Sequence, residues 1–184
     1  MKIQKMARSF MLSSVLILAC GQWAQANVSK ETEEASRALG ANMVSEITFD
    51  AESAALTDSA KQEIRDFIAS ARGSGNIDEI KLAVWADREY PATDTKASKA
   101  DINLARERAK NVKNFMREEL SLKNVDTYNM TERPNALQKF LHTPTAKMKS
   151  KMETAGAAPQ TTDDIGWFGQ KAQASKAVVM VYIK

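Results

Sequence analysis

The sequence is poor in the residues that build disulfides and metal sites. It contains one cysteine, Cys20, and one histidine, His142. A disulfide needs two thiols and a histidine-rich metal site needs several imidazoles, so both are excluded. The acidic residues show no spacing that indicates a carboxylate metal site. We therefore expect no metal, no cofactor, and a fold that is held together by its hydrophobic core alone.

Motifs for catalysis are lacking as well. The sequence contains no Gly-rich phosphate loop and no paired nucleophile and base. His142 lies in the segment Phe140-Leu141-His142-Thr143-Pro144, which carries no nucleophile motif. This histidine is predicted to be a surface residue at a helix end, and the chain is predicted not to be an enzyme.

An excess of charge of one sign is missing from the main body of the chain. The formal net charge is +3 and the pI is about 8.9. Three of the 26 basic residues lie within residues 1–26, which hold no acid, so residues 27–184 carry 23 basic and 23 acidic side chains. A neutral body provides no electrostatic argument for a nucleic-acid partner, and none is expected.

The N-terminus has the pattern of a secretory signal peptide over residues 1–26. Lys2, Lys5 and Arg8 precede a mostly apolar run over residues 10–20, and small residues follow it. The apolar run is too short for a membrane-spanning helix. The protein is therefore predicted to be exported.

Two processing sites compete within this segment. Ala24-Gln25-Ala26 has the small-x-small form that signal peptidase cleaves, which would leave Asn27 as the first residue. Ile17-Leu18-Ala19-Cys20 resembles a lipobox, in which Cys20 would be lipidated and would anchor the protein to the outer membrane. We favour cleavage after Ala26 because that site is the cleaner match, and lipidation of Cys20 is the alternative.

The rest of the chain alternates between strand and helix patterns. Residues 27–43 form a lead-in and residues 44–184 one domain. Strands are predicted at 46–50, 80–85, 125–130 and 177–183, and helices at 57–73, 101–116 and 134–155, the last broken near Thr143-Pro144. On the long helix, apolar residues at helical spacing are predicted to be buried: Ile102, Ala105, Ala109, Val112 and Met116.

This order predicts the fold class. A strand-helix alternation ending on a strand favours an α/β (α+β sandwich) fold, β-α-β-α-β-α-β, with one mixed sheet of about four strands and helices packed on one face. Residues 177–183 are apolar on both sides of the strand, so they are predicted to form an inner strand.

One group of charged residues indicates a binding site. Asp87 follows the second predicted strand, and Asp101 and Arg108 lie seven residues apart on the next helix, so they share a face. An acid and an arginine at the end of a strand could hold a zwitterion, with Asp87 on the ammonium and Arg108 on the carboxylate. The alternative is an internal Asp87–Arg108 salt bridge or two unrelated surface charges.

Four short motifs are arranged in the order found in one known family. They are Ile47-Thr48-Phe49 with Ala55-Leu56 and Ala60, then Trp85-Ala86-Asp87, then Leu104-Ala105-Arg106-Glu107-Arg108-Ala109, then Met130-Thr131-Glu132-Arg133-Pro134. The last three resemble the Gly-His-Thr-Asp, Leu-Ser-x-x-Arg-Ala and Gly-Glu-x-x-Pro of the OmpA-like domain. The resemblance covers residues 44–184, nearly all of the exported chain.

The resemblance implies a non-catalytic periplasmic domain that binds the peptide stem of peptidoglycan. Asp87 would receive the amine of diaminopimelate and Arg108 its carboxylate, with Trp85 and Asp101 beside them. Both charged groups are expected to face solvent in the free protein. Asp101 stands where the family has asparagine, and its negative charge is expected to weaken carboxylate binding.

The chain also departs from the family in ways that favour a second function. Val84, Trp85 and Ala86 replace the usual Gly-His-Thr, and the loop at 86–100 is longer than is common in the family. A degenerate domain could instead be a structural subunit or interaction module of an envelope assembly. Its partner proteins would then contact the loop 86–100 or the Trp167-Phe168 loop.

Overall fold

The computed structural model describes residues 28–87, 97–157 and 176–184. The predicted signal peptide with Cys20, the Trp167-Phe168 loop and residues 88–96 of the long loop lie outside the described residues. The elements are α1 (Lys30–Ala38), β1 (Met43–Thr48), α2 (Asp58–Ser74), β2 (Ile77–Val84), α3 (Lys99–Glu118), β3 (Val125–Asn129), α4 (Ala136–Phe140), α5 (Pro144–Thr154) and β4 (Lys176–Ile183).

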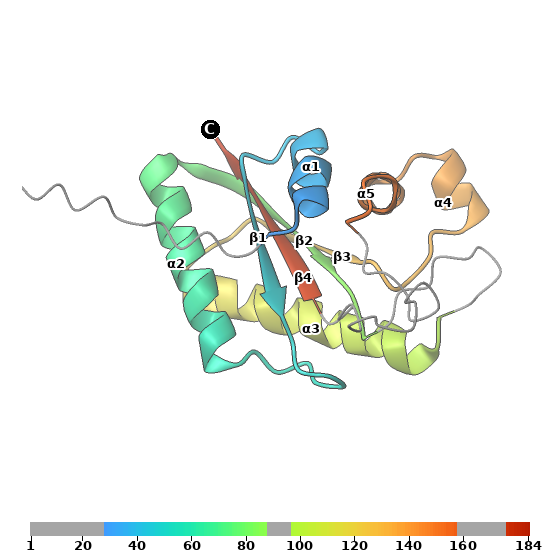
Figure 1. Ribbon diagram of the computed structural model, residues 1–184, viewed down its shortest axis with the longest axis horizontal. Helices are drawn as coiled ribbons and strands as arrows, with labels where there is room; N and C mark the ends of the chain where they lie inside the picture. The colour runs from blue at the N-terminus through green and yellow to red at the C-terminus, as the bar shows by residue number, and fades with distance from the viewer. Residues whose placement is uncertain (1–27, 88–96, 158–175) are drawn as a thin grey trace, which may run out of the picture.

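The four strands form one mixed sheet in the order β1-β4-β2-β3 (Figure 1). β4 pairs antiparallel with β1 on one side and with β2 on the other, and β2 pairs in parallel with β3. The last strand of the chain therefore lies inside the sheet, as its apolar pattern predicts. The predicted α+β fold with one mixed four-stranded sheet is confirmed.

Helices cover both faces of this sheet, which corrects the expectation of helices on one face. Ala177, Val179 and Val181 of β4 belong to a core with residues of α2 and α3. Val178 and Met180 belong to a second core, with residues from α1 and α5. The second face is apolar as well, so it must also be covered to remove its side chains from water.

The helix ends follow from local sequence. Thr57 accepts a hydrogen bond from the Ala60 N–H at the start of α2, and Ser98 does the same for Asp101 at the start of α3. Thr143 caps α5, and Pro144 fills its first turn, where its missing N–H costs nothing. The helical break predicted at Thr143-Pro144 separates α4 from α5.

Two details differ from the sequence-based expectation. The first strand spans Met43–Thr48 rather than residues 46–50, although Phe49 is still buried just beyond its end. On α3, Ala105, Ala109, Val112 and Met116 are buried, whereas Ile102 is only half-buried. Ile102 lies in the first turn of the helix, at the edge of the core.

Candidate functional site

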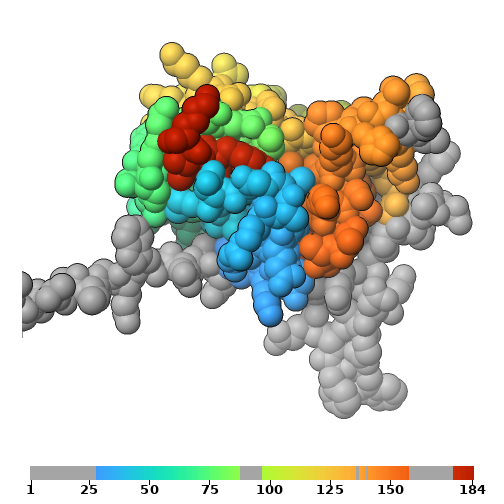
Figure 2. Space-filling view, turned by 90° about the horizontal axis from the view of Figure 1, so that it is seen from above, coloured from blue at the N-terminus to red at the C-terminus, as the bar shows by residue number. Residues whose placement is uncertain are grey.

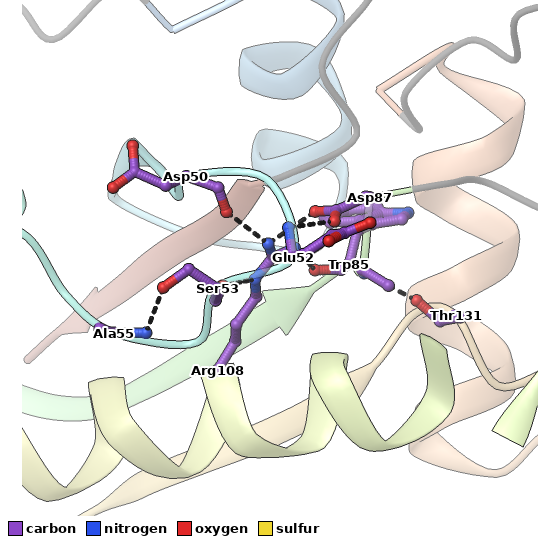
Figure 3. A network of polar contacts seen from close by, with 9 residues as sticks. Asp50, Glu52, Ser53, Ala55, Trp85, Asp87, Arg108 and Thr131 are labelled. Carbon is purple, nitrogen blue, oxygen red and sulfur yellow. Dashed lines mark hydrogen bonds and ion pairs between the residues drawn. The ribbon is translucent and has the colours of Figure 1, made fainter. Parts of the chain in front are cut away.

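Asp87 and Arg108 form an ion pair beyond the carboxyl end of β2. The Asp87 Oδ1 and Arg108 Nη2 atoms are 2.6 Å apart. Asp87 comes three residues after the end of β2, and Arg108 lies in the middle of α3, so the packing of α3 on the sheet joins them (Figure 3). The predicted spacing therefore brings these two residues to one place.

Arg108 also holds three main-chain carbonyls. Its Nε donates to the Ser53 carbonyl at 2.7 Å, its Nη1 to Trp85 at 3.1 Å, and its Nη2 to Asp50 at 3.0 Å (Figure 3). The guanidinium carbon also lies 4.9 Å from the centre of the Phe49 ring. One side chain on α3 thereby closes the β1–α2 loop against the end of β2.

Arg108 has 0% of its side chain exposed, and Asp87 has 21% exposed. The expectation that both groups face solvent is therefore wrong for the arginine. A buried guanidinium must have its donors satisfied, and here the loop carbonyls and Asp87 supply the acceptors. Of the two side chains, only Asp87 has exposed surface that a ligand can contact.

The backbone of Glu52 supports Asp87 from the other side. The Glu52 N–H donates to Asp87 Oδ2, so both carboxylate oxygens of Asp87 accept hydrogen bonds. Glu52 has a φ of 57°, in the left-handed region that costs a non-glycine residue about 1 kcal/mol. The hydrogen bond to a charged acceptor offsets this cost and ties the β1–α2 loop to Asp87.

Trp85 contributes its main-chain carbonyl to the site. Its side chain is fully buried and packs in the core beneath α1 and α5. The indole Nε1 is buried and has no hydrogen-bond partner among the described residues. This apolar side chain anchors the end of β2, and ligand contact by Trp85 stays a prediction.

Asp101 lies at the start of α3. Its Oδ2 accepts a hydrogen bond from the Ser98 hydroxyl at 2.8 Å, and its backbone N–H donates to the Ser98 Oγ at 3.0 Å. Two helical turns separate it from Arg108, a rise of about 10 Å. Asp101 therefore supports the helix end, and its repulsive effect on a bound carboxylate stays a prediction.

Three polar residues around the pair were not predicted from the sequence. Asn111 Nδ2 donates to the Ala54 carbonyl at 2.8 Å, one turn after Arg108. Thr131 is buried, and its Oγ1 accepts from the Ala86 N–H at 2.9 Å. Asn129 Oδ1 accepts from the Thr131 N–H at 3.0 Å.

These three residues hold the two loops that carry the site. The helical spacing of Arg108 and Asn111 could have indicated a shared role, because residues three apart lie on one face. Thr131 is separated from Ala86 by 45 positions, and no sequence pattern links them. Only the parallel pairing of β2 and β3 brings their ends together.

Neither a metal cluster nor a spanning helix is found among residues 28–87, 97–157 and 176–184. No three histidine, cysteine or acidic side chains there are grouped so that they could hold an ion. None of the described helices has the length and apolar character needed to cross a membrane. His142 is exposed at the turn between α4 and α5, as predicted.

Comparison with known proteins gives weak evidence of structural likeness. No family model and no curated protein matches the sequence. The OmpA-like domain of FopA1 from Francisella tularensis is a structural neighbour with 12% identity and a TM-score of 0.38. The match covers 75% of this chain and 70% of that chain. The fold described above rests on the strands and helices of this chain and not on that likeness.

Proposed function

We propose that this chain is a non-catalytic cell-envelope protein of the periplasm that binds the peptide stem of peptidoglycan. The observation that carries the proposal is the pair of Asp87 and Arg108, an acid and a guanidinium 2.6 Å apart at the end of a strand. The head group of diaminopimelate carries an ammonium and a carboxylate on one carbon. Each of its charges has a partner of opposite sign in this pair.

Binding by this pair requires an exchange of partners. Because Arg108 is fully enclosed, a ligand carboxylate reaches its guanidinium only after Asp87 has moved. The ligand carboxylate then takes the place of Asp87 on Nη2, and the released Asp87 accepts the ligand ammonium. Two ion pairs replace one, so no buried charge is left without a partner.

The arrangement makes Asp87 the residue that moves. Its side chain reaches the surface, whereas Arg108 is held by the carbonyls of Asp50, Ser53 and Trp85. The β1–α2 loop is bound to Asp87 through the Glu52 N–H, so the loop would shift when Asp87 does. We therefore expect the ligand to change the environment of residues 50–53.

The burial of Arg108 favours a second function, that of a structural subunit or interaction module of an envelope assembly. In that case the Asp87–Arg108 pair only closes the β1–α2 loop, and the site binds no ligand. Trp85 supports this alternative because its indole adds apolar contacts where the resembled family has polar groups. The two functions differ in whether the protein binds the cell wall.

The test is co-sedimentation of the full chain with lipid-free peptidoglycan sacculi. Asp87→Ala is expected to weaken binding by roughly tenfold or more, because it removes a charged hydrogen bond. The matched control is Asp126→Ala, since Asp126 is exposed on β3 opposite Lys81, in the middle of β2. This control is expected to bind as the wild type does.

Two further measurements separate the outcomes. Free diaminopimelate should compete with sacculi for the wild type and not for Asp87→Ala. Thermal melts of each variant show whether the domain is folded at the assay temperature. Equally poor sedimentation of all three proteins, with no competition, would contradict wall binding and favour the structural subunit.

A further inference from the structure

Residues 133–152, which include α4 and most of α5, form a basic lobe. Five basic residues lie in this segment and no acidic residue does: Arg133, Lys139, Lys147, Lys149 and Lys151. Residues 27–184 as a whole are balanced in charge, so positive charge is concentrated here. Figure 2 shows this lobe in orange at one side of the molecule, beside α1.

Two of the five cations are directed inward. Lys149 is buried, its Nζ donates to the Met130 carbonyl, and it lies 3.7 Å from Glu153. Arg133 Nη2 lies 4.0 Å from the same carboxylate, and the arginine side chain is 17% exposed. Glu153 thus pairs with these two inward-directed cations, and the positive charges of the three other basic residues of the lobe are left unbalanced.

The other three cations are directed to solvent. Lys139, Lys147 and Lys151 are exposed, and none of them forms an ion pair within the described ranges. Lys147 and Lys151 are four residues apart on α5, so they share its outer face. Residues 146, 148, 149 and 152 lie on the inner face of the same helix. The outer surface of the lobe therefore carries three lysines, and Glu153 is the acidic residue of α5.

The lobe also exposes two leucines. Leu137 and Leu141 have 64% and 62% of their surface exposed, more than any other large apolar residue in the described parts of the chain. Leu137 lies on α4 and Leu141 is its C-cap residue, one helical turn further along the chain. Single exposed leucines are ordinary, whereas a pair on one turn beside lysines indicates a surface that is covered on binding.

We propose that the basic lobe docks on the surface of an anionic lipid bilayer. Leu137 and Leu141 would enter the boundary between headgroups and acyl chains, while the outer lysines would lie against the anionic headgroups. Lysine side chains can bury their alkyl stems in this boundary and keep the ammonium among the phosphates. An anionic bilayer thus complements both the positive charge and the exposed leucines of the lobe.

The position of the leucines favours a bilayer over a protein partner. Figure 1 shows α4 at the edge of the molecule, on the side away from α2. A protruding apolar pair requires no shape-matched pocket when it enters a lipid boundary. The contact would be reversible, because two leucines and three lysines bury too little to hold the protein permanently.

This inference does not depend on peptidoglycan binding. The lobe and the Asp87–Arg108 pair use different residues, and lipid-free sacculi contain no bilayer. Failure of one experiment therefore leaves the other proposal standing. Together the two surfaces would let one domain contact the wall and a membrane.

The test is co-sedimentation of the full chain with lipid vesicles at low salt, at the lipid concentration that gives half-maximal binding. Vesicles of phosphatidylcholine with phosphatidylglycerol are compared with vesicles of phosphatidylcholine alone. Replacing Lys139, Lys147 and Lys151 by glutamine is expected to weaken binding to the anionic vesicles by about tenfold or more. Added salt should have the same effect on the wild type.

The matched control removes three positive charges elsewhere. Glutamine at Lys61, Lys110 and Lys123 changes the net charge equally but leaves the lobe intact, and is expected to reduce binding by less than about twofold. The double variant Leu137→Ser and Leu141→Ser is expected to weaken binding while the salt dependence stays the same. The N-terminal segment is common to all variants and cannot account for differences between them.

Three outcomes would overturn the proposal. The first is equal binding to charged and uncharged vesicles, and the second is wild-type binding by both lobe variants. The third is a lipid-free wild type that self-associates in size-exclusion chromatography and a leucine variant that does not. That result would show that a second copy of the chain covers the leucines.

Discussion

The guanidinium of Arg108 is held 2.6 Å from the Asp87 carboxylate in a position without solvent exposure. The two residues come from α3 and from the loop after β2, and the carbonyls around them come from Asp50 and Ser53 of the β1–α2 loop and from Trp85. One arginine therefore connects three segments of the chain. Measurements of unfolding can separate the role of Arg108 in stability from any role in ligand binding.

Arg108→Ala is expected to lower the free energy of unfolding by about 3–5 kcal/mol, because it breaks a buried ion pair and leaves loop carbonyls unpaired. Urea denaturation measures this change. The matched control is Arg106→Ala on the same helix, whose side chain is 60% exposed. Its effect should stay below about 1 kcal/mol. A small effect of Arg108→Ala would show that the loop finds other partners.

Val179→Asp is expected to unfold the domain. Val179 is fully buried in the inner strand, and an unpaired carboxylate there costs several kcal/mol against a total stability of about 5–15 kcal/mol. Thr127→Asp, at an exposed position of β3, is the control and should remain folded. Circular dichroism melts distinguish the two. A cooperative melt of Val179→Asp would contradict the packing of β4 on both faces.

Asp101→Asn is expected to strengthen sacculus binding slightly, by removing a negative charge from the side of the proposed carboxylate site. At a separation of about 10 Å the effect is close to the screening length, so it should be clearest at low salt. Binding isotherms at two salt concentrations measure it. The Ser98 cap is kept, since asparagine also accepts from a hydroxyl. Weaker binding by this variant would show that Asp101 itself contacts the ligand.

Stability is expected to fall as the pH rises above about 10. Burial raises the pKa values of Tyr128 and Tyr182, so both phenols are held neutral in the folded state. For Lys81 burial lowers the pKa, but the hydrogen bond to Glu79 and the charges around it outweigh burial and raise the pKa overall.

The pKa shifts of Tyr128, Tyr182 and Lys81 all change the stability in the same direction. A folded-state pKa above the unfolded value means that the unfolded chain releases its proton first, so stability is lost as the pH passes upward through both values. Urea denaturation between neutral and strongly alkaline pH tests this. Tyr128→Phe should flatten the pH dependence, because it removes one of the shifted groups. An unchanged slope in this variant would contradict the assignment.

Processing provides a test of the N-terminal prediction. If cleavage follows Ala26, mass spectrometry of the exported protein should show an unmodified Asn27 at its N-terminus, and Cys20→Ser should leave export unchanged. A diacylated or triacylated Cys20 would instead favour the lipobox and a membrane anchor.

The sequence by itself determined most of the strands and helices, although β1 begins and ends earlier than its pattern predicts. Thr57, Ser98 and Thr143 cap helices where their side chains precede apolar residues at helical spacing. The two apolar sides of β4 predicted an inner strand, because only a strand covered on both faces has this pattern. Local hydrogen bonding and hydrophobic periodicity are short-range, so a sequence is sufficient to read them.

The tertiary structure decided which face each helix covers and how the site is enclosed. The sequence placed Asp87 and Arg108 near each other, but it could not show that carbonyls of the β1–α2 loop would bury the arginine. Thr131 meets Ala86 only because β2 and β3 pair in parallel across 45 positions. Such contacts depend on main-chain atoms of distant segments, which have the same chemistry in every residue and leave no trace in the sequence.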